Sequence, residues 1–240
     1  MKLRDFWPAL FLLAALQANA QGEEEEEDDP LSGKVTLGYL ATSGNTETSS
    51  LNAGFEAAYA AGKWLHEANA SAINASENNV TTAEAYELGW TSNWNLTERD
   101  FLFGRLNWRN DEFGGFNTQF SQTLGYARQV VDNEKHKLRL EVGAGARQSE
   151  DQLGVDQDET ILTGGLNYRY QFTENSQFRQ TIKIESGDQN TFSESVTAVS
   201  AQLIGRLALT ASFTYRNNSD VPVGTENTDT RTAISLEYGF

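Results

Sequence analysis

The feature that most constrains this chain is an alternation of apolar and polar residues with a period of two, which runs from Val35 to the C-terminal Phe240. In its clearest stretch, residues 138–147, Leu, Leu, Val, Ala and Ala alternate with Arg, Glu, Gly, Gly and Arg. A period of two is typical of a β-strand with one dry face and one wet face, and no helical period competes with it. The sequence therefore predicts an all-β protein.

The alternating segments predict about twelve strands, with a range of about 10 to 12, each long enough to cross the hydrocarbon layer of a membrane when tilted. The links between them are unequal: the two longest expected links, 148–158 and 217–227, both belong to the odd-numbered set, and the even-numbered links are short. Short turns on one side and longer loops on the other are typical of transmembrane barrels, and an even strand count returns both termini to the periplasmic side. In residues 191–203 the pattern does not decide which parity faces outward.

A soluble sandwich or a lipocalin-like barrel also alternates, so the charges on the wet face decide between these folds. A soluble core would not accept many charged side chains, whereas a hydrated lumen would. The prediction is a transmembrane antiparallel up-and-down β-barrel with these lumen-facing charged residues: Glu56, Arg105, Arg139, Glu141, Arg147, Arg169, Lys183 and Glu185.

Aromatic residues recur near the ends of the expected strands, as in the interfacial girdles of outer-membrane barrels. The last strand ends with Tyr238 and Phe240 on its apolar face. A terminal aromatic residue in this position resembles the signal that the outer-membrane assembly machinery recognises. We therefore interpret Tyr238 and Phe240 as an assembly signal.

The N-terminal residues predict export. Lys2 and Arg4 precede the apolar stretch 6–16, and Ala18-Asn19-Ala20 supplies the small residues of a cleavage site, so residues 1–20 are expected to be a cleaved signal peptide. The alternative, a membrane anchor, would need an apolar stretch about twice as long. Residues 21–32 contain the acidic run Glu23–Asp29 and are expected to form a disordered periplasmic tail, or else a weak tether for a divalent cation or a partner. The barrel is expected to occupy residues 33–240.

The overall charge excludes several function classes. With 18 Lys and Arg against 34 Asp and Glu, the formal net charge is -16, which disfavours binding to nucleic acid.

The chain has no cysteine and only two histidines, His66 and His136, so neither a metal nor another cofactor is expected. An outer-membrane lipase or protease would place a His at the outer rim, but both histidines lie near expected periplasmic turns. Carboxylates at 150–151 and 156–159 match no complete calcium cage. The chain is therefore not expected to be an enzyme.

Several stretches resemble a known family. These are Thr42-Ser43-Gly44-Asn45-Thr46-Glu47-Thr48 at the end of the first expected strand, Leu124-Gly125-Tyr126, and the C-terminal run from Tyr215 to Phe240. Together they are similar to the YdiY-type family of salt-induced outer-membrane proteins, whose domain has no assigned biochemical function. The resemblance implies an outer-membrane location, a barrel fold and a link to salt stress. It implies no reaction and no catalytic residues.

Three hypotheses follow for the function. Arg and Glu side chains in the lumen could line a narrow passive channel, or they could pair and fill the barrel so that its role is purely structural. No expected link is long enough to fold in as a constriction. The third hypothesis, an outer-membrane enzyme, is the least favoured. The expected partners are outer-membrane lipid, lipopolysaccharide and the assembly machinery, and the protein is expected to be a monomer.

Overall fold

The computed structural model describes residues 30–42, 48–222 and 224–240. The expected signal peptide and the acidic run Glu23–Asp29 lie outside the described residues, as do residues 43–47 of the stretch that resembles the family. Within the described ranges, no helix is long and apolar enough to cross a membrane.

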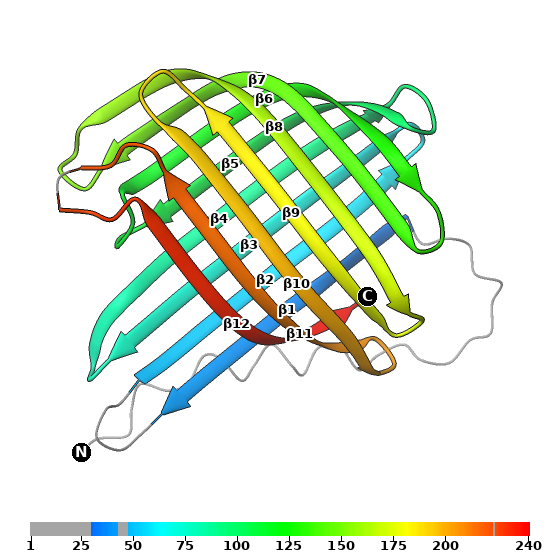
Figure 1. Ribbon diagram of the computed structural model, residues 1–240, viewed down its shortest axis with the longest axis horizontal. Coiled ribbons are helices and arrows are strands. Elements are labelled where there is room, and N and C mark those ends of the chain that lie inside the picture. Colours follow the sequence, from blue (N-terminus) through cyan, green and yellow to red (C-terminus); the bar gives the residue numbers. More distant parts are fainter. Residues whose placement is uncertain (1–29, 43–47, 223) are drawn as a thin grey trace.

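The described residues form a closed barrel in which each strand is antiparallel to its two neighbours (Figure 1). The chain order is also the order round the barrel, and the first strand pairs with the last. This confirms the predicted all-β up-and-down barrel and fixes the strand number at the upper end of the expected range. The strands are β1 (Leu31–Thr42), β2 (Thr48–Ala61), β3 (Trp64–Glu77), β4 (Val80–Asn95), β5 (Asp100–Asp111), β6 (Phe116–Asp132), β7 (His136–Asp151), β8 (Asp156–Thr173), β9 (Ser176–Ser186), β10 (Thr191–Ile204), β11 (Leu207–Asn218) and β12 (Thr228–Gly239).

The two ends of the barrel differ in their links. At one end, called the turn end, the links are residues 62–63, 96–99, 133–135, 174–175 and 205–206, and the described chain also begins and finishes there (Figure 1). The opposite loop end carries the longest described link, residues 219–227. One loop-end link is nevertheless very tight, because Asn78 and Asn79 both have positive φ (48° and 63°), as a two-residue hairpin turn requires.

The seam between β1 and β12 is short. Cα pairing runs only from Lys34 opposite Gly239 to Leu37 opposite Leu236, whereas β1 and β2 pair along their whole lengths. The seam is extended at the turn end by two backbone hydrogen bonds between Gly33 and Phe240, of 3.1 and 2.9 Å. Gly33 permits this contact, because a Cβ there would lie 2.5 Å from the Phe240 ring.

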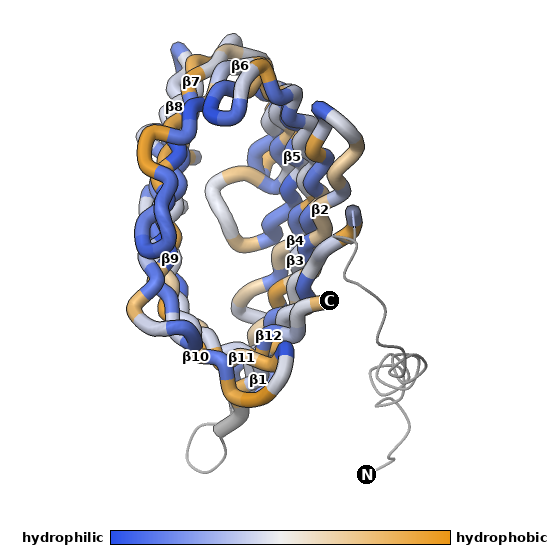
Figure 2. Tube along the Cα trace, turned by 90° about the vertical axis from the view of Figure 1, so that its right-hand side faces the viewer, coloured by the Kyte–Doolittle hydropathy of each residue, from blue (hydrophilic) through white to orange (hydrophobic). Residues whose placement is uncertain are grey.

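The alternation separates an apolar outer surface from a polar interior. Large apolar side chains such as Leu124, Val142, Leu162 and Ile234 are more than 60% exposed on the outside. The buried positions include many polar and charged groups, among them Arg147 at 1% exposure. Figure 2 shows the same alternation of hydrophilic and hydrophobic residues along the strands, which form a flattened ring. The apolar residues therefore form an outer belt, and the usual dry core is replaced by a charged lumen.

Two expectations need correction, and one open question is answered. The expected long link 148–158 is mostly strand, because β7 continues to Asp151 and β8 begins at Asp156. Residues 148–150 pair with residues 156–158, so the backbone ladder continues beyond the point where alternation is lost. The first strand begins at Leu31, two residues earlier than expected. In β10 the register turns Glu194 inward, because it pairs with the lumen-lining residues Lys183 and Arg216.

Candidate functional site: a charged lumen

The candidate site is a lumen cavity of about 1080 Å³. Eleven Lys and Arg residues and seven Glu residues line it. All eight residues predicted to face the lumen lie on this lining, and their positions follow from period two and the strand register: Glu56, Arg105, Arg139, Glu141, Arg147, Arg169, Lys183 and Glu185.

A charged bridge crosses the lumen between β4 and β11. Arg216 Nη2 lies 2.5 Å from Glu87 Oε1, although the two strands are separated by four others round the barrel. Arg109 Nε also approaches Glu87, at 3.4 Å, and Arg216 Nε lies 2.5 Å from Glu194. Because all four side chains point inward, this cluster narrows the water-filled path at its level.

A second ionic cluster ties the β9–β10 link to the lumen wall near the loop end. Arg147 lies 2.5 Å from Glu159 Oε1 and 3.5 Å from Glu185 Oε2, and its Nη2 also donates to the carbonyl of Asn190 at 2.5 Å. The other oxygen of Glu159 accepts backbone N–H groups from Gln189 and Asn190. Since all three charged side chains are almost fully buried, the Asn190 backbone is held against the barrel interior.

A third cluster connects β3, β4, β5 and β7. Glu141 pairs with Arg105 at 2.7 Å and with Arg139 at 3.0 Å. Arg139 also donates to the Asn93 side chain, which donates in turn to Glu67. Asn93 is fully buried, so its amide is satisfied by this chain of side-chain hydrogen bonds.

At the turn end, three basic residues lie side by side on adjacent strands. Lys137 of β7 pairs in register with Arg169 of β8, which pairs with Arg179 of β9, and all three line the cavity. Lys137 lies 3.5 Å from Asp132, and Arg179 lies 3.3 Å from Glu237. Within the described part of the chain, Arg169 forms no ion pair. We call these three residues the basic row.

The loop end is partly covered by the link 219–227. A Cβ added at Gly115 would lie 2.7 Å from Val221 Cγ1, so this link packs against the link between β5 and β6, on the other side of the barrel. The expectation that no link could fold in as a constriction is therefore wrong. It failed because the length of a link does not show the direction in which the link folds.

Ten further charged lining residues were absent from the predicted set: Lys34, Glu67, Glu87, Arg109, Lys137, Arg179, Glu194, Arg216, Arg231 and Glu237. The parity signal could have found Glu87, which stands between the outward-facing Tyr86 and Leu88. Alternation could not have identified Glu194, because the outward face of β10 is itself rich in Ser and Thr and so is not distinguished from the inward face.

Both histidines stack with aromatic rings near the turn end. His66 lies between Trp64 and Trp90, with centroid distances of 5.8 and 5.7 Å, and its Nδ1 lies 2.9 Å from Ser92 Oγ. His136 stacks on Tyr170 at 4.7 Å, and its Nδ1 lies 2.8 Å from the Tyr168 hydroxyl.

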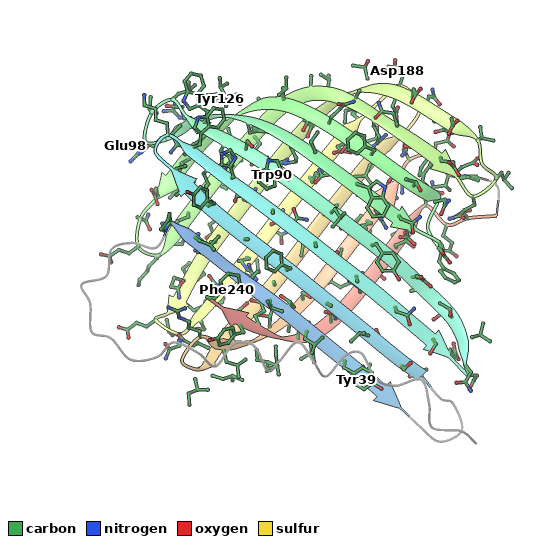
Figure 3. All side chains as sticks on the ribbon, turned by 180° about the vertical axis from the view of Figure 1, so that it is seen from behind. Tyr39, Trp90, Glu98, Tyr126, Asp188 and Phe240 are labelled. Atoms are coloured by element: carbon green, nitrogen blue, oxygen red, sulfur yellow. The ribbon has the colours of Figure 1, made fainter. Side chains whose placement is uncertain are left out.

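Figure 3 shows Trp90 and Tyr126 toward the turn end, whereas Asp188 lies at the loop end. Neither histidine contacts a carboxylate in the hydrogen bonds and ion pairs of the described residues. Nor do the residues that the structure describes contain a group of three or more His, Cys, Asp or Glu that could hold a metal ion. The two histidines and the aromatic rings that they contact are arranged as in an aromatic girdle.

Sequence comparison places this barrel in a family. Residues 35–240 match the model described as "Protein of unknown function, DUF481". The chain belongs to the DUF481 family. The uncharacterized protein YdiY of Escherichia coli K12 is 31% identical over 253 residues, with both chains covered in full. The resemblance to YdiY-type proteins is therefore confirmed.

Solved structures support the fold. An outer-membrane channel from Pseudomonas putida F1 has a TM-score of 0.53 and 11% identity, covering 91% of this chain and 100% of that one. The NanC porin has a TM-score of 0.48 and 10% identity, covering 86% of this chain and 97% of that one. The fold of the DUF481 chain is thus similar to that of the Pseudomonas putida channel.

Proposed function

We propose that this DUF481 protein is a narrow passive channel of the bacterial outer membrane that favours small anions over cations. The observation that supports the proposal most directly is the separation of charge. The whole chain has 18 basic and 34 acidic residues, yet the lumen lining has eleven basic residues and seven acidic ones. A narrow, low-dielectric path lined with excess positive charge raises the local concentration of anions.

The cavity favours a channel over a filled barrel. Ion pairs and hydrogen bonds consume many of the lining charges, but a volume of about 1080 Å³ remains between them. The bridge between Glu87 and Arg216 and the inward link 219–227 restrict this path, so we expect a small conductance. A water-filled path of this kind passes ions and small solutes without a catalytic step, and no enzymatic role is proposed.

Planar-bilayer recording under a salt gradient tests the proposal. The expected result is small conductance steps whose reversal potential has the sign of anion preference. Arg169→Ala is expected to reduce that preference, because it removes a lining charge that has no ion-pair partner among the described residues. Cation preference, or a lack of steps from protein that shows heat-modifiable gel mobility, would contradict the channel.

The outer-membrane location is proposed on two grounds: the outer apolar belt and the likeness to outer-membrane barrels. The proposal that the protein contributes to growth under salt stress rests only on the resemblance of its sequence to the YdiY-type family of salt-induced outer-membrane proteins. Its test is a comparison of a deletion strain and a complemented strain at low and high external salt. Equal growth of the two strains at both salt levels would contradict this role.

A further inference from the structure

The basic row places three like charges next to one another on β7, β8 and β9. Lys137, Arg169 and Arg179 occupy directly opposed positions in the register, and like charges in this arrangement destabilise a sheet. Asp132 lies 3.5 Å from Lys137, and Glu237 lies 3.3 Å from Arg179, so each carboxylate offsets one end of the row. Arg169 in the middle has no ion pair with a described residue. Within the described chain, the repulsion is therefore not offset at the centre of the row.

The nearest positions on the inward face of β8 and β9 supply no carboxylate to Arg169. Two residues closer to the turn end, Gln171 of β8 pairs with Gln177 of β9. Two residues in the other direction, Asn167 pairs with Thr181, whose hydroxyl donates a 3.1 Å hydrogen bond to the Asn167 side chain. On these two strands the row is thus bordered by neutral side chains that form hydrogen bonds.

Arg169 also differs from the other basic residues of the lumen. Of the eleven that line the cavity, nine form an ion pair with a described carboxylate, and the two that do not are Arg169 and Arg231. Arg231, on β12 near the loop end, still interacts electrostatically with Glu87 and Glu194. Arg169 stands between two other cations and is exposed to the lumen, so an added anion gains most at this position.

The donor set of the row favours a phosphate group over a carboxylate. Each guanidinium presents a planar fork of N–H donors that matches two oxygens of one oxyanion, whereas a lysine supplies a point charge. Directly opposed side chains have Cβ atoms about 4.5–5.5 Å apart, so the forks of Arg169 and Arg179 can reach the same group. A carboxylate offers two oxygens and one charge. A phosphate ester group offers three oxygens and a charge of about −1.5 to −2, which suits three adjacent cations better.

We propose that the basic row binds the phosphate group of a small solute, either inorganic phosphate or a phosphate ester, at the turn end of the lumen. Arg169 and Arg179 hold the phosphate oxygens, and Lys137 adds charge from the third strand. As the solute class of the anion channel, this inference rests on the proposed function, but binding to the row does not require a conducting path. Because the row lines a water-filled cavity, binding weakens as salt shortens the Debye length.

Isothermal titration calorimetry of the refolded barrel, in a detergent without phosphate groups and at low ionic strength, tests the site. The wild type should bind inorganic phosphate saturably and acetate several-fold more weakly, because acetate satisfies only one fork. Glycerol 3-phosphate is the second arm: tighter binding than inorganic phosphate assigns the site to phosphate esters, and weaker binding assigns it to the free ion. A lack of saturable binding of both phosphates, or binding no tighter than that of acetate, would overturn the proposal.

Two arginine variants show whether the row itself is responsible. Arg169→Gln should weaken phosphate binding several-fold, whereas Arg231→Gln, which also removes a lining arginine without an ion pair to a described residue, should leave it unchanged. Heat-modifiable gel mobility shows that each variant is folded. If Arg169→Gln does not fold, Arg169→Lys keeps the charge but removes the fork and should also weaken binding. Equal losses in the Arg169 and Arg231 variants would assign binding to the general potential of the lumen and overturn the inference.

Conductance separates this inference from the proposed function. Saturating phosphate should reduce the chloride current of the wild type several-fold and that of Arg169→Gln much less. An undiminished chloride current in wild-type protein that conducts would overturn the placement of the site in the path. If the protein binds phosphate but does not conduct, the channel proposal fails and the site stands. If it conducts without saturable phosphate binding, the site fails and the channel stands.

Discussion

At the scale of single residues, the barrel interior contains ion pairs that are closed off from water. Arg147 is 1% exposed and is shared between Glu159 and Glu185, and its guanidinium also holds the carbonyl of Asn190. Glu185 also pairs with Lys183 at 2.7 Å, so removing Arg147 leaves Glu159 as the buried carboxylate without a cation. The cluster therefore fixes the β9–β10 link against the lumen wall.

We expect Arg147→Met to lower the free energy of unfolding by about 3–5 kcal/mol, because the buried Glu159 loses its cation and Glu185 keeps only Lys183, at 2.7 Å. Urea unfolding of the refolded protein, followed by tryptophan fluorescence, measures the change. Asp132→Asn is the control: its pair with Lys137 is half exposed, so the loss should be below about 1 kcal/mol. A similar small loss in both variants would show that the Arg147 cluster is not a stabilising contact.

The bridge between Glu87 and Arg216 gives a paired prediction. Glu87→Gln and Arg216→Gln both remove the ion pair that crosses the lumen, so each should increase single-channel conductance. Their effects on selectivity should be opposite, because Glu87→Gln removes a negative lining charge and Arg216→Gln removes a positive one. Reversal potentials in a salt gradient measure both. A decrease in conductance in either variant would be inconsistent with a bridge that narrows the path.

The sequence identified eight charged residues that line the lumen but could not identify their partners across it. Parity alone places Glu141 and Arg105 on the inner face. The contact of Glu87 with Arg216 depends on the flattened cross-section, which brings together strands that are separated by four others (Figure 2). No local pattern encodes that distance, since alternation is the same in a round barrel and in a flattened one.

At the scale of elements, closure of the barrel depends on a short seam. Only four Cα pairs join β1 to β12, so the contacts beyond them matter more than they would between other strands. Phe240 adds two backbone bonds to Gly33 and stacks on Phe55 at 6.3 Å. The same residue is part of the proposed assembly signal. In the structure it also joins the two edges of the seam through its bonds to Gly33.

We expect Phe240→Ala to reduce the fraction of protein that assembles into the barrel in cells, because both the seam contact and the terminal aromatic residue are lost. The measurement is the heat-modifiable band in outer-membrane fractions, relative to total protein. Tyr215→Ala is the control, since it removes a similarly outward-facing aromatic residue from β11, away from the seam. Equal reductions in the two variants would mean that the terminal position has no special role.

The element boundaries also show where sequence reasoning stops. Alternation located all twelve strands, because each strand has an apolar outer face and a polar inner face. It did not predict the loop-end parts of β7 and β8, because both faces of the two strands are polar there, as in the pair of Gln148 with Asp158. Backbone pairing continues there without a change of environment between the faces, so the strand remains and the pattern disappears.

At the scale of the whole molecule, the described chain begins and finishes at the turn end, and the longest described link lies at the loop end (Figure 1). An outer-membrane barrel with an even number of strands has short periplasmic turns and longer extracellular loops. We therefore propose that the turn end faces the periplasm. Asp188 and Glu98 would then lie on opposite sides of the membrane (Figure 3).

Single-cysteine labelling of intact cells tests this orientation, because the cysteine-free chain gives no background reaction. Asp188→Cys, in the β9–β10 link, should react with a membrane-impermeant maleimide that is too large to pass the channel. Glu98→Cys, in the β4–β5 link, should react only after the outer membrane is permeabilised, because the bilayer separates it from the reagent. Both positions are exposed, so accessibility within the protein does not account for a difference. Labelling of Glu98→Cys but not Asp188→Cys on intact cells would reverse the proposed orientation.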